Sequence, residues 1–74
     1  MDLEAFARNV RTARATAGMT QEDVSEASGI HVTEVSRIER GLRDPRVSTM
    51  LRLAGALGVP ASHLVDAAEG RPPA

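Results

Sequence analysis

Hydrophobic residues recur along the chain at the spacing of amphipathic helices, and glycines separate the helical segments. The first such face follows the i, i+3, i+7 spacing and consists of Leu3, Phe6, Val10, Ala13 and Ala17. Later segments repeat the pattern with Ile30, Val35 and Ile38, then with Val47, Met50, Leu53, Ala54 and Leu57, and finally with Leu64 and Val65. No stretch alternates β-branched and polar residues as a strand does. The pattern predicts an all-α fold, a compact bundle of five helices.

The second helix has the clearest start signal in the chain. Thr20 is a good N-cap, and Asp23 three residues later can complete a capping box. Met19 and Val24 have the spacing of a hydrophobic staple around this cap. We therefore predict a short helix over residues 21–28, ended by a glycine.

The remaining helix ends are also predicted from glycine and proline. Only Gly29–Val32 separates the second helix from a third, which runs to Arg40. Asp44–Pro45 has the form of an N-cap and first-turn pair for the fourth helix. Gly55 inside that helix indicates a close backbone approach or an interface, because glycine costs about 1 kcal/mol there relative to alanine. Val59–Pro60 begins the fifth.

Length and composition restrict the class of protein. The chain has 74 residues, 42% hydrophobic and 26% charged, which suits one small globular domain. Very regular helix packing, self-association or both are expected, because a core of this size is marginal by itself. The absence of cysteine excludes disulfides and thiolate chemistry and favours the cytoplasm, and neither a membrane span nor a secretory signal is expected. We predict a domain over residues 1–67 and a disordered tail over residues 68–74.

Charge is distributed unevenly. The net charge of −1 shows no basic excess of the kind that nucleic-acid binders often have. All nine basic residues are arginine, however, and four of them lie within ten positions that hold only two acids: Arg37, Arg40, Arg43 and Arg46. A local cationic cluster is therefore expected from the third helix into the loop that follows it.

The arrangement of two short helices around a tight glycine turn is the signature of a helix-turn-helix. Blocks in the right order accompany it: residues 10–14, 18–24, 28–30 and 35–41, then Pro45 and residues 53–59. Over about residues 4–66 the chain resembles the lambda/434 repressor-like (Cro/C1, XRE-type) DNA-binding domain. The resemblance implies a helix-turn-helix formed by helices two and three and a role in transcription regulation. Short stand-alone relatives include restriction–modification controller proteins, small phage or plasmid repressors and antitoxin partners.

The resemblance also implies which residues read the bases, since the second helix of the motif enters the major groove. The residues on the corresponding face are Val32, Thr33, Ser36 and Arg37. Arg37 can bond both acceptors of guanine. Thr33 can bond a base edge or pack on a thymine methyl group, whereas Val32 offers methyl contact only.

Phosphate contacts are implied for a second group of residues: Gln21, His31, Arg40, Arg43 and Arg46. For Arg40 the alternative is an electrostatic role at the helix C-terminus. His31 departs from the serine or threonine that relatives use as N-cap, so that either the helix starts later, at Thr33, or His31 faces a phosphate. Glu34 is discordant beside phosphates, and points outward or accepts from cytosine.

Two further groups have structural roles. Arg14 and Glu39 resemble the family's partly buried ion pair between the first and third helices. A homodimer on an inverted-repeat operator is expected because one such domain binds DNA weakly. Its interface is predicted at Leu51, Gly55, Leu64 and Val65.

Other functions have less support in the sequence. His31 and His63 are far apart, and His63 with Asp66 supplies only two metal ligands, so that no catalytic site, metal, cofactor or small-molecule ligand is expected. The alternative hypothesis is a protein-interaction module that uses the same fold without sequence-specific DNA binding. The net charge favours that alternative, and the arginine cluster opposes it.

Overall fold

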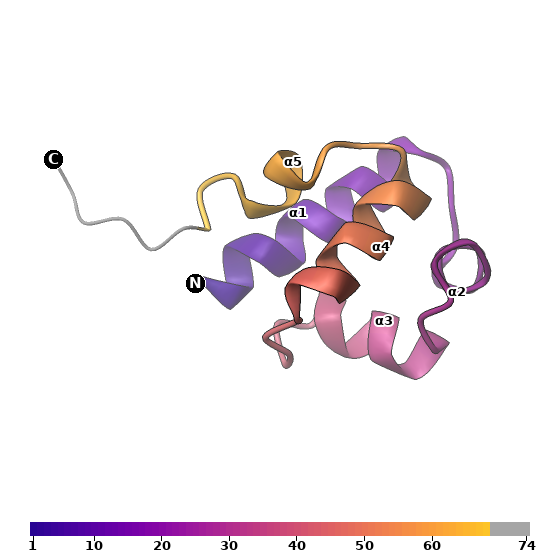
Figure 1. Ribbon diagram of the computed structural model, residues 1–74, viewed down its shortest axis with the longest axis horizontal. Coiled ribbons are helices and arrows are strands. Elements are labelled where there is room, and N and C mark those ends of the chain that lie inside the picture. The colour runs from indigo at the N-terminus through magenta and orange to yellow at the C-terminus, as the bar shows by residue number, and fades with distance from the viewer. Residues whose placement is uncertain (69–74) are drawn as a thin grey trace, which may run out of the picture.

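The computed structural model describes residues 1–68, which form five helices and no strand (Figure 1). In chain order the helices are α1 (Leu3–Thr16), α2 (Gln21–Ser28), α3 (Val32–Glu39), α4 (Val47–Leu57) and α5 (Ala61–Val65). Helix α1 packs against α3 and α5, α2 packs against α3 and α4, and α4 packs against α5. The predicted all-α five-helix architecture is confirmed.

The helix ends around the motif are held by local hydrogen bonds. The Thr20 hydroxyl accepts from the Asp23 backbone N–H, and the Asp23 carboxylate accepts from the Thr20 N–H, so the predicted capping box is present. Gly29 ends α2 with φ of +74°, a left-handed conformation that suits glycine. A turn of this kind is short enough to bring α3 directly against α2.

Predicted helix ends differ from the structure at α3, α4 and α5, and α5 begins at Ala61 with Pro60 as its N-cap. Helix α4 begins at Val47 with Arg46 as its N-cap, and Asp44–Pro45 lies in the preceding loop. Arg46 caps through its backbone conformation alone, because no side-chain hydrogen bond is made. Helix α3 ends at Glu39, one residue before Arg40, which is its C-cap.

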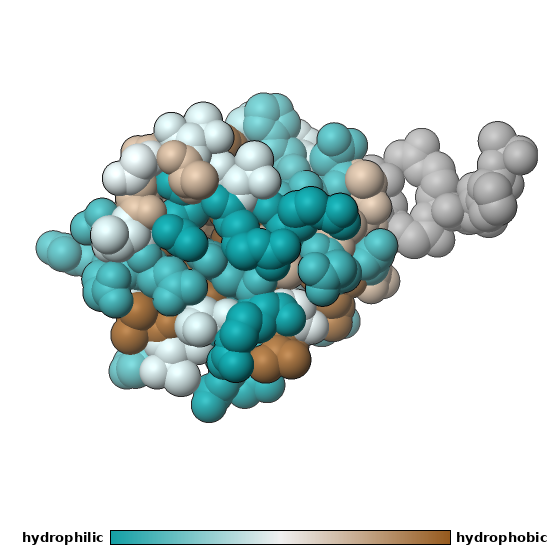
Figure 2. Space-filling view, turned by 180° about the vertical axis from the view of Figure 1, so that it is seen from behind, coloured by the Kyte–Doolittle hydropathy of each residue, from teal (hydrophilic) through white to brown (hydrophobic). Residues whose placement is uncertain are grey.

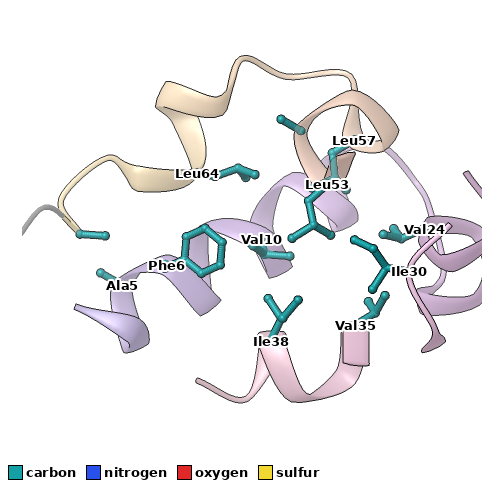
Figure 3. Packing of buried hydrophobic residues seen from close by; sticks show 12 residues of the cluster. Ala5, Phe6, Val10, Val24, Ile30, Val35, Ile38, Leu53, Leu57 and Leu64 are labelled. Carbon is teal, nitrogen blue, oxygen red and sulfur yellow. The ribbon is translucent and has the colours of Figure 1, made fainter. Parts of the chain in front are cut away.

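The core fills the space between α1 and the other helices (Figure 3). Its largest fully buried side chains are Phe6, Ile38, Leu53, Leu64, Val10, Val24 and Val35. Val47 was predicted in this core and is 71% exposed, because the helix starts there and the residue lies on the outer face of α4. Each of the other predicted α4 core residues is buried or packed against the cluster.

The last described segment returns to the start of the chain. The Asp2 backbone N–H donates to the Ala68 carbonyl at 2.8 Å, and Ala68 is fully buried. The Asn9 amide donates to the carbonyls of Leu64 and Asp66 at 3.0 and 2.7 Å. Ala68, which was predicted to begin the tail, therefore packs in the core, and the rest of the predicted tail, residues 69–74, lies outside the described residues.

Hydrophilic side chains cover most of the face seen from behind, and hydrophobic ones form small separate patches there (Figure 2). None of the helices formed by residues 1–68 has the length and hydrophobicity needed to cross a membrane.

Candidate nucleic-acid interface

The outer face of α3 is a polar stripe. Val35 and Ile38 point into the core, and the opposite side carries Thr33, Ser36, Arg37 and Arg40 at i, i+3, i+4 and i+7. Thr33 and Arg40 are exposed, and Ser36 and Arg37 are partly exposed. Val32, one turn before Ser36, lies at the edge of this stripe and is half-buried. The structure therefore brings the four predicted base-reading residues together on one accessible surface.

His31 is the N-cap of α3, and the helix begins at Val32 rather than at Thr33. Its Nδ1 accepts a hydrogen bond from the Thr33 backbone N–H at 3.1 Å. Because Nδ1 is the acceptor in that bond, Nε2 is the ring nitrogen left to donate. The imidazole thus caps the helix with one nitrogen and retains a donor on the other, and that donor is compatible with the predicted phosphate contact.

Replacing His31 with alanine is expected to lower the free energy of unfolding by about 1 kcal/mol, because an N-terminal N–H of α3 loses its acceptor. Replacement with asparagine, a good N-cap, is expected to restore most of this loss. Urea unfolding followed by circular dichroism measures both variants. Equal stability of the alanine and asparagine variants would show that the capping bond contributes nothing.

The predicted phosphate-binding arginines differ in their surroundings. Arg46 is exposed and makes no ion pair within residues 1–68. The Arg40 Nε–H points to the Ser36 carbonyl at 3.4 Å, which is the helix C-terminal role considered as its alternative. Arg43 Nε donates to Glu34 Oε1 at 3.2 Å. Glu34 is therefore paired with an arginine while part of its side chain stays exposed.

A hollow of about 470 Å³ lies between the start of α3 and α4. Basic side chains on its walls are His31, Arg46 and Arg52, and Glu34 and Asp44 add two acids. Arg52 was missed in the sequence, because it lies outside the cluster of four arginines and reaches this surface only through the packing of α4. Positive and negative groups thus lie together beside the polar stripe.

Glu39 connects three helices from a buried position. Its side chain is 3% exposed, and it accepts from Arg14 Nε at 2.6 Å and from Arg14 Nη2 at 2.9 Å. The Gln21 amide adds a third bond to the same carboxylate at 3.2 Å. Arg11 donates to the Glu39 backbone carbonyl. The ion pair expected from the resemblance therefore joins α1 to α3, and the Gln21 hydrogen bond joins α2 to the same carboxylate.

The bidentate contact has an electrostatic consequence for Arg14. Hydrogen bonding to Glu39 raises the pKa of Arg14 above its ordinary value, so its guanidinium stays charged at any physiological pH. Arg14 also donates through Nη1 to the Met19 carbonyl at 3.1 Å. Gln21 uses one amide hydrogen on Glu39, and its second remains compatible with the predicted phosphate contact. Glu39 thus also orients a side chain at the start of α2.

The predicted dimer residues fall into two groups. Leu51 is 57% exposed, and Gly55 is exposed with no atom within 4 Å of the position that a Cβ would take. The prediction for Leu64 was wrong, because this side chain is fully buried in the core of the single chain. Val65 is half-buried against the same core. Val47, Leu51 and Gly55 instead form an exposed stripe at i, i+4 and i+8, which we call the α4 stripe.

Two other features were considered as possible sites: clusters of metal-ligating residues, and the hollow beside His63 and Asp66. Within the part of the chain that the structure describes, no three His, Cys, Asp or Glu residues gather closely enough to hold a metal ion. His63 and Asp66 lie instead on the wall of a hollow of about 550 Å³ between α1 and the α4–α5 turn. Small and apolar residues such as Ala13, Ala17 and Leu57 make up much of that wall.

A short helix, a left-handed glycine turn and a second short helix with a polar outer face define a helix-turn-helix protein. The helix-turn-helix family model HTH_3 matches residues 10–64, which is most of the chain. The chain belongs to this family, of the Cro/C1 (XRE) type.

Individual relatives agree with the family assignment. The chain is 41% identical over 64 residues to the HTH-type transcriptional regulator y4dJ of Sinorhizobium fredii, a match that covers 86% of this chain and 83% of the relative. It is 38% identical over 66 residues to the control protein C.SmaI of Serratia marcescens, covering 88% and 79%. The crystal structure of the restriction–modification controller protein C.AhdI from Aeromonas hydrophila superposes with a TM-score of 0.82 at 33% identity, covering 85% of this chain and 96% of that one.

Proposed function

We propose that the chain is a transcription regulator that binds double-stranded DNA sequence-specifically, with α3 in the major groove. The observation that carries the proposal is the polar stripe of α3, in which short polar side chains and two arginines occupy the accessible face of a helix whose other face is core. Such a face can donate to base edges and phosphates without exposing hydrophobic surface. The proposed site of action is the cytoplasm, and no catalytic step or cofactor forms part of the proposal.

Each predicted contact has a place in this proposal. Val32, Thr33, Ser36 and Arg37 face the bases, with Arg37 bonded to guanine. Phosphates are contacted from α2 by Gln21, from the start of α3 by His31, and from the region after it by Arg40, Arg43 and Arg46. The membership of the family and the names of the relatives support a regulator over a protein-interaction module.

Selection from a random pool of double-stranded DNA at roughly physiological salt tests the proposal. We expect enrichment of an inverted repeat with a guanine in each half-site and half-site centres about one helical turn apart. A pool that stays random would contradict it and favour the protein-interaction alternative.

We propose that the regulator acts as a homodimer through the α4 stripe. Val47 and Leu51 are among the few large hydrophobic side chains exposed in residues 1–68, and they share one helix face with Gly55, where a second backbone can approach closely. The match to restriction–modification controller proteins leads us to place the chain in that class of regulator, although small phage or plasmid repressors have the same form.

Replacing Leu51 with glutamate is expected to leave the fold intact, since the side chain is exposed, and to abolish the dimer by placing two charges in its interface. Affinity for the enriched DNA should fall about 100-fold, because the second half-site no longer binds as part of the same molecule. Light scattering at tens of micromolar and DNA titration measure the two effects. Ala15→Glu adds the same charge at an exposed position of α1 and should change neither the oligomeric state nor the DNA affinity. A wild-type protein that is monomeric with and without operator would contradict the dimer.

A further inference from the structure

Glu34 is an acid on the surface proposed to contact DNA, and its carboxylate forms ion pairs with two arginines. Its Oε1 accepts from Arg43 Nε at 3.2 Å and lies 3.9 Å from Arg37 Nη1. Glu34 and Arg37 are i, i+3 neighbours on α3, whereas Arg43 comes from the loop that follows the helix. One oxygen thus links the proposed guanine-reading residue to a proposed phosphate-contacting residue.

All three side chains remain partly exposed. The exposed fractions are 42% for Arg37, 35% for Glu34 and 45% for Arg43, so both guanidinium groups keep donors that can reach a ligand. A guanidinium has five N–H donors in a fixed plane, and a carboxylate at one edge restricts the orientation of the others. Because a side chain that is already ordered loses less entropy on binding, this contact favours a bidentate bond to guanine.

The same carboxylate lowers the attraction of this surface for any phosphate backbone. Sequence-independent binding grows with the number of cations that replace counterions on the DNA, and a negative charge between two of these arginines reduces it. A residue that weakens binding to every sequence and improves the geometry for the correct one increases the ratio between them.

We propose that Glu34 is a positioning residue that sets the sequence discrimination of α3 by holding Arg37 and Arg43. The inference rests on the proposed DNA-binding function. It assigns to Glu34 no contact with a base of its own: its partners are the two guanidinium groups, and through them it acts on the DNA.

Two substitutions at this position separate charge from geometry. Glu34→Gln removes the charge, and Glu34→Asp keeps the charge but shortens the side chain by one methylene, which draws the carboxylate away from Arg43. The probes are the duplex enriched by the wild-type chain and a scrambled duplex of equal composition, titrated at several salt concentrations. Glu26→Gln removes an exposed acid of α2 that makes no ion pair within residues 1–68, and serves as the matched control.

We expect both Glu34 variants to lose discrimination between the two duplexes by up to about fivefold, the upper end of what exposed ion pairs support. Glu34→Gln should also bind scrambled DNA more tightly, with a steeper salt dependence, while Glu26→Gln keeps the wild-type ratio. An unchanged ratio in both Glu34 variants would overturn this inference and leave the proposed function standing. A changed preference at one cytosine alone would also overturn it, because Glu34 would then contact a base itself. Wild-type protein that does not distinguish the duplexes would overturn the proposed function as well.

Discussion

Replacing Glu39 with glutamine is expected to lower the free energy of unfolding by about 3 kcal/mol, a large part of the stability of so small a domain. The carboxylate is almost fully buried and accepts three side-chain hydrogen bonds, two from Arg14 and one from Gln21. A neutral amide leaves the Arg14 guanidinium without its counter-charge and turns an N–H donor toward other donors. Thermal and urea unfolding followed by circular dichroism measure the decrease.

Controls separate the ion pair from a general effect of charge. Glu26→Gln removes an exposed acid and is expected to change stability by less than about 0.5 kcal/mol. The double variant Arg14→Met with Glu39→Met is expected to be more stable than Glu39→Gln, since neither partner is then left charged and unpaired. Stability of Glu39→Gln within about 0.5 kcal/mol of wild type would contradict the role assigned to this carboxylate.

Replacing Arg37 with alanine is expected to remove the guanine preference from both half-sites of the operator. A bidentate arginine–guanine contact discriminates by about 1–3 kcal/mol, and a dimer makes two of them, so affinity for the enriched duplex should fall by at least about 30-fold. Arg37 is partly exposed on the polar stripe and contributes nothing to the core, and the variant should therefore keep its fold. Repeating the selection with the variant measures the change in preference.

Arg46→Ala provides the comparison. Arg46 is exposed and proposed to contact phosphate, so its removal should weaken binding about equally on all sequences and lower the salt slope by about one for each phosphate that it neutralises. If Arg37→Ala instead lowered affinity equally on all sequences and kept the guanine preference, Arg37 would be assigned to a DNA phosphate and not to a base.

Local signals in the sequence predicted the helices of the motif well. The capping box of Thr20 and Asp23 and the glycine at position 29 act within a few residues, so α2 has its predicted bounds. The start of α4 was predicted two residues too early because Asp44–Pro45 satisfies the local rule for a cap, whereas the extended backbone of Arg46 makes that residue the N-cap. That His31 is the N-cap of α3 was likewise not predicted, because this role depends on a hydrogen bond from the Thr33 N–H that residue type alone does not reveal.

Interactions between distant residues were harder to predict. The i, i+3 spacing of Glu34 and Arg37 is visible in the sequence, but the position of Arg43 beside them depends on the path of the loop. The burial of Leu64 and the exposure of Val47 depend on how α5 and α4 sit on α1 and the core, because both residues carry hydrophobic side chains at helical spacing. Only the Arg14–Glu39 pair was anticipated among long-range ion pairs, through the resemblance to a family.

The central claim, sequence-specific recognition by α3, is tested most directly by the relative affinity of the wild-type chain for the enriched duplex and for a scrambled duplex at roughly physiological salt. We predict that the enriched duplex binds at least about 1,000-fold more tightly. Equal affinities that both fall steeply as salt is added would contradict the claim, because binding would then rest on phosphate attraction alone.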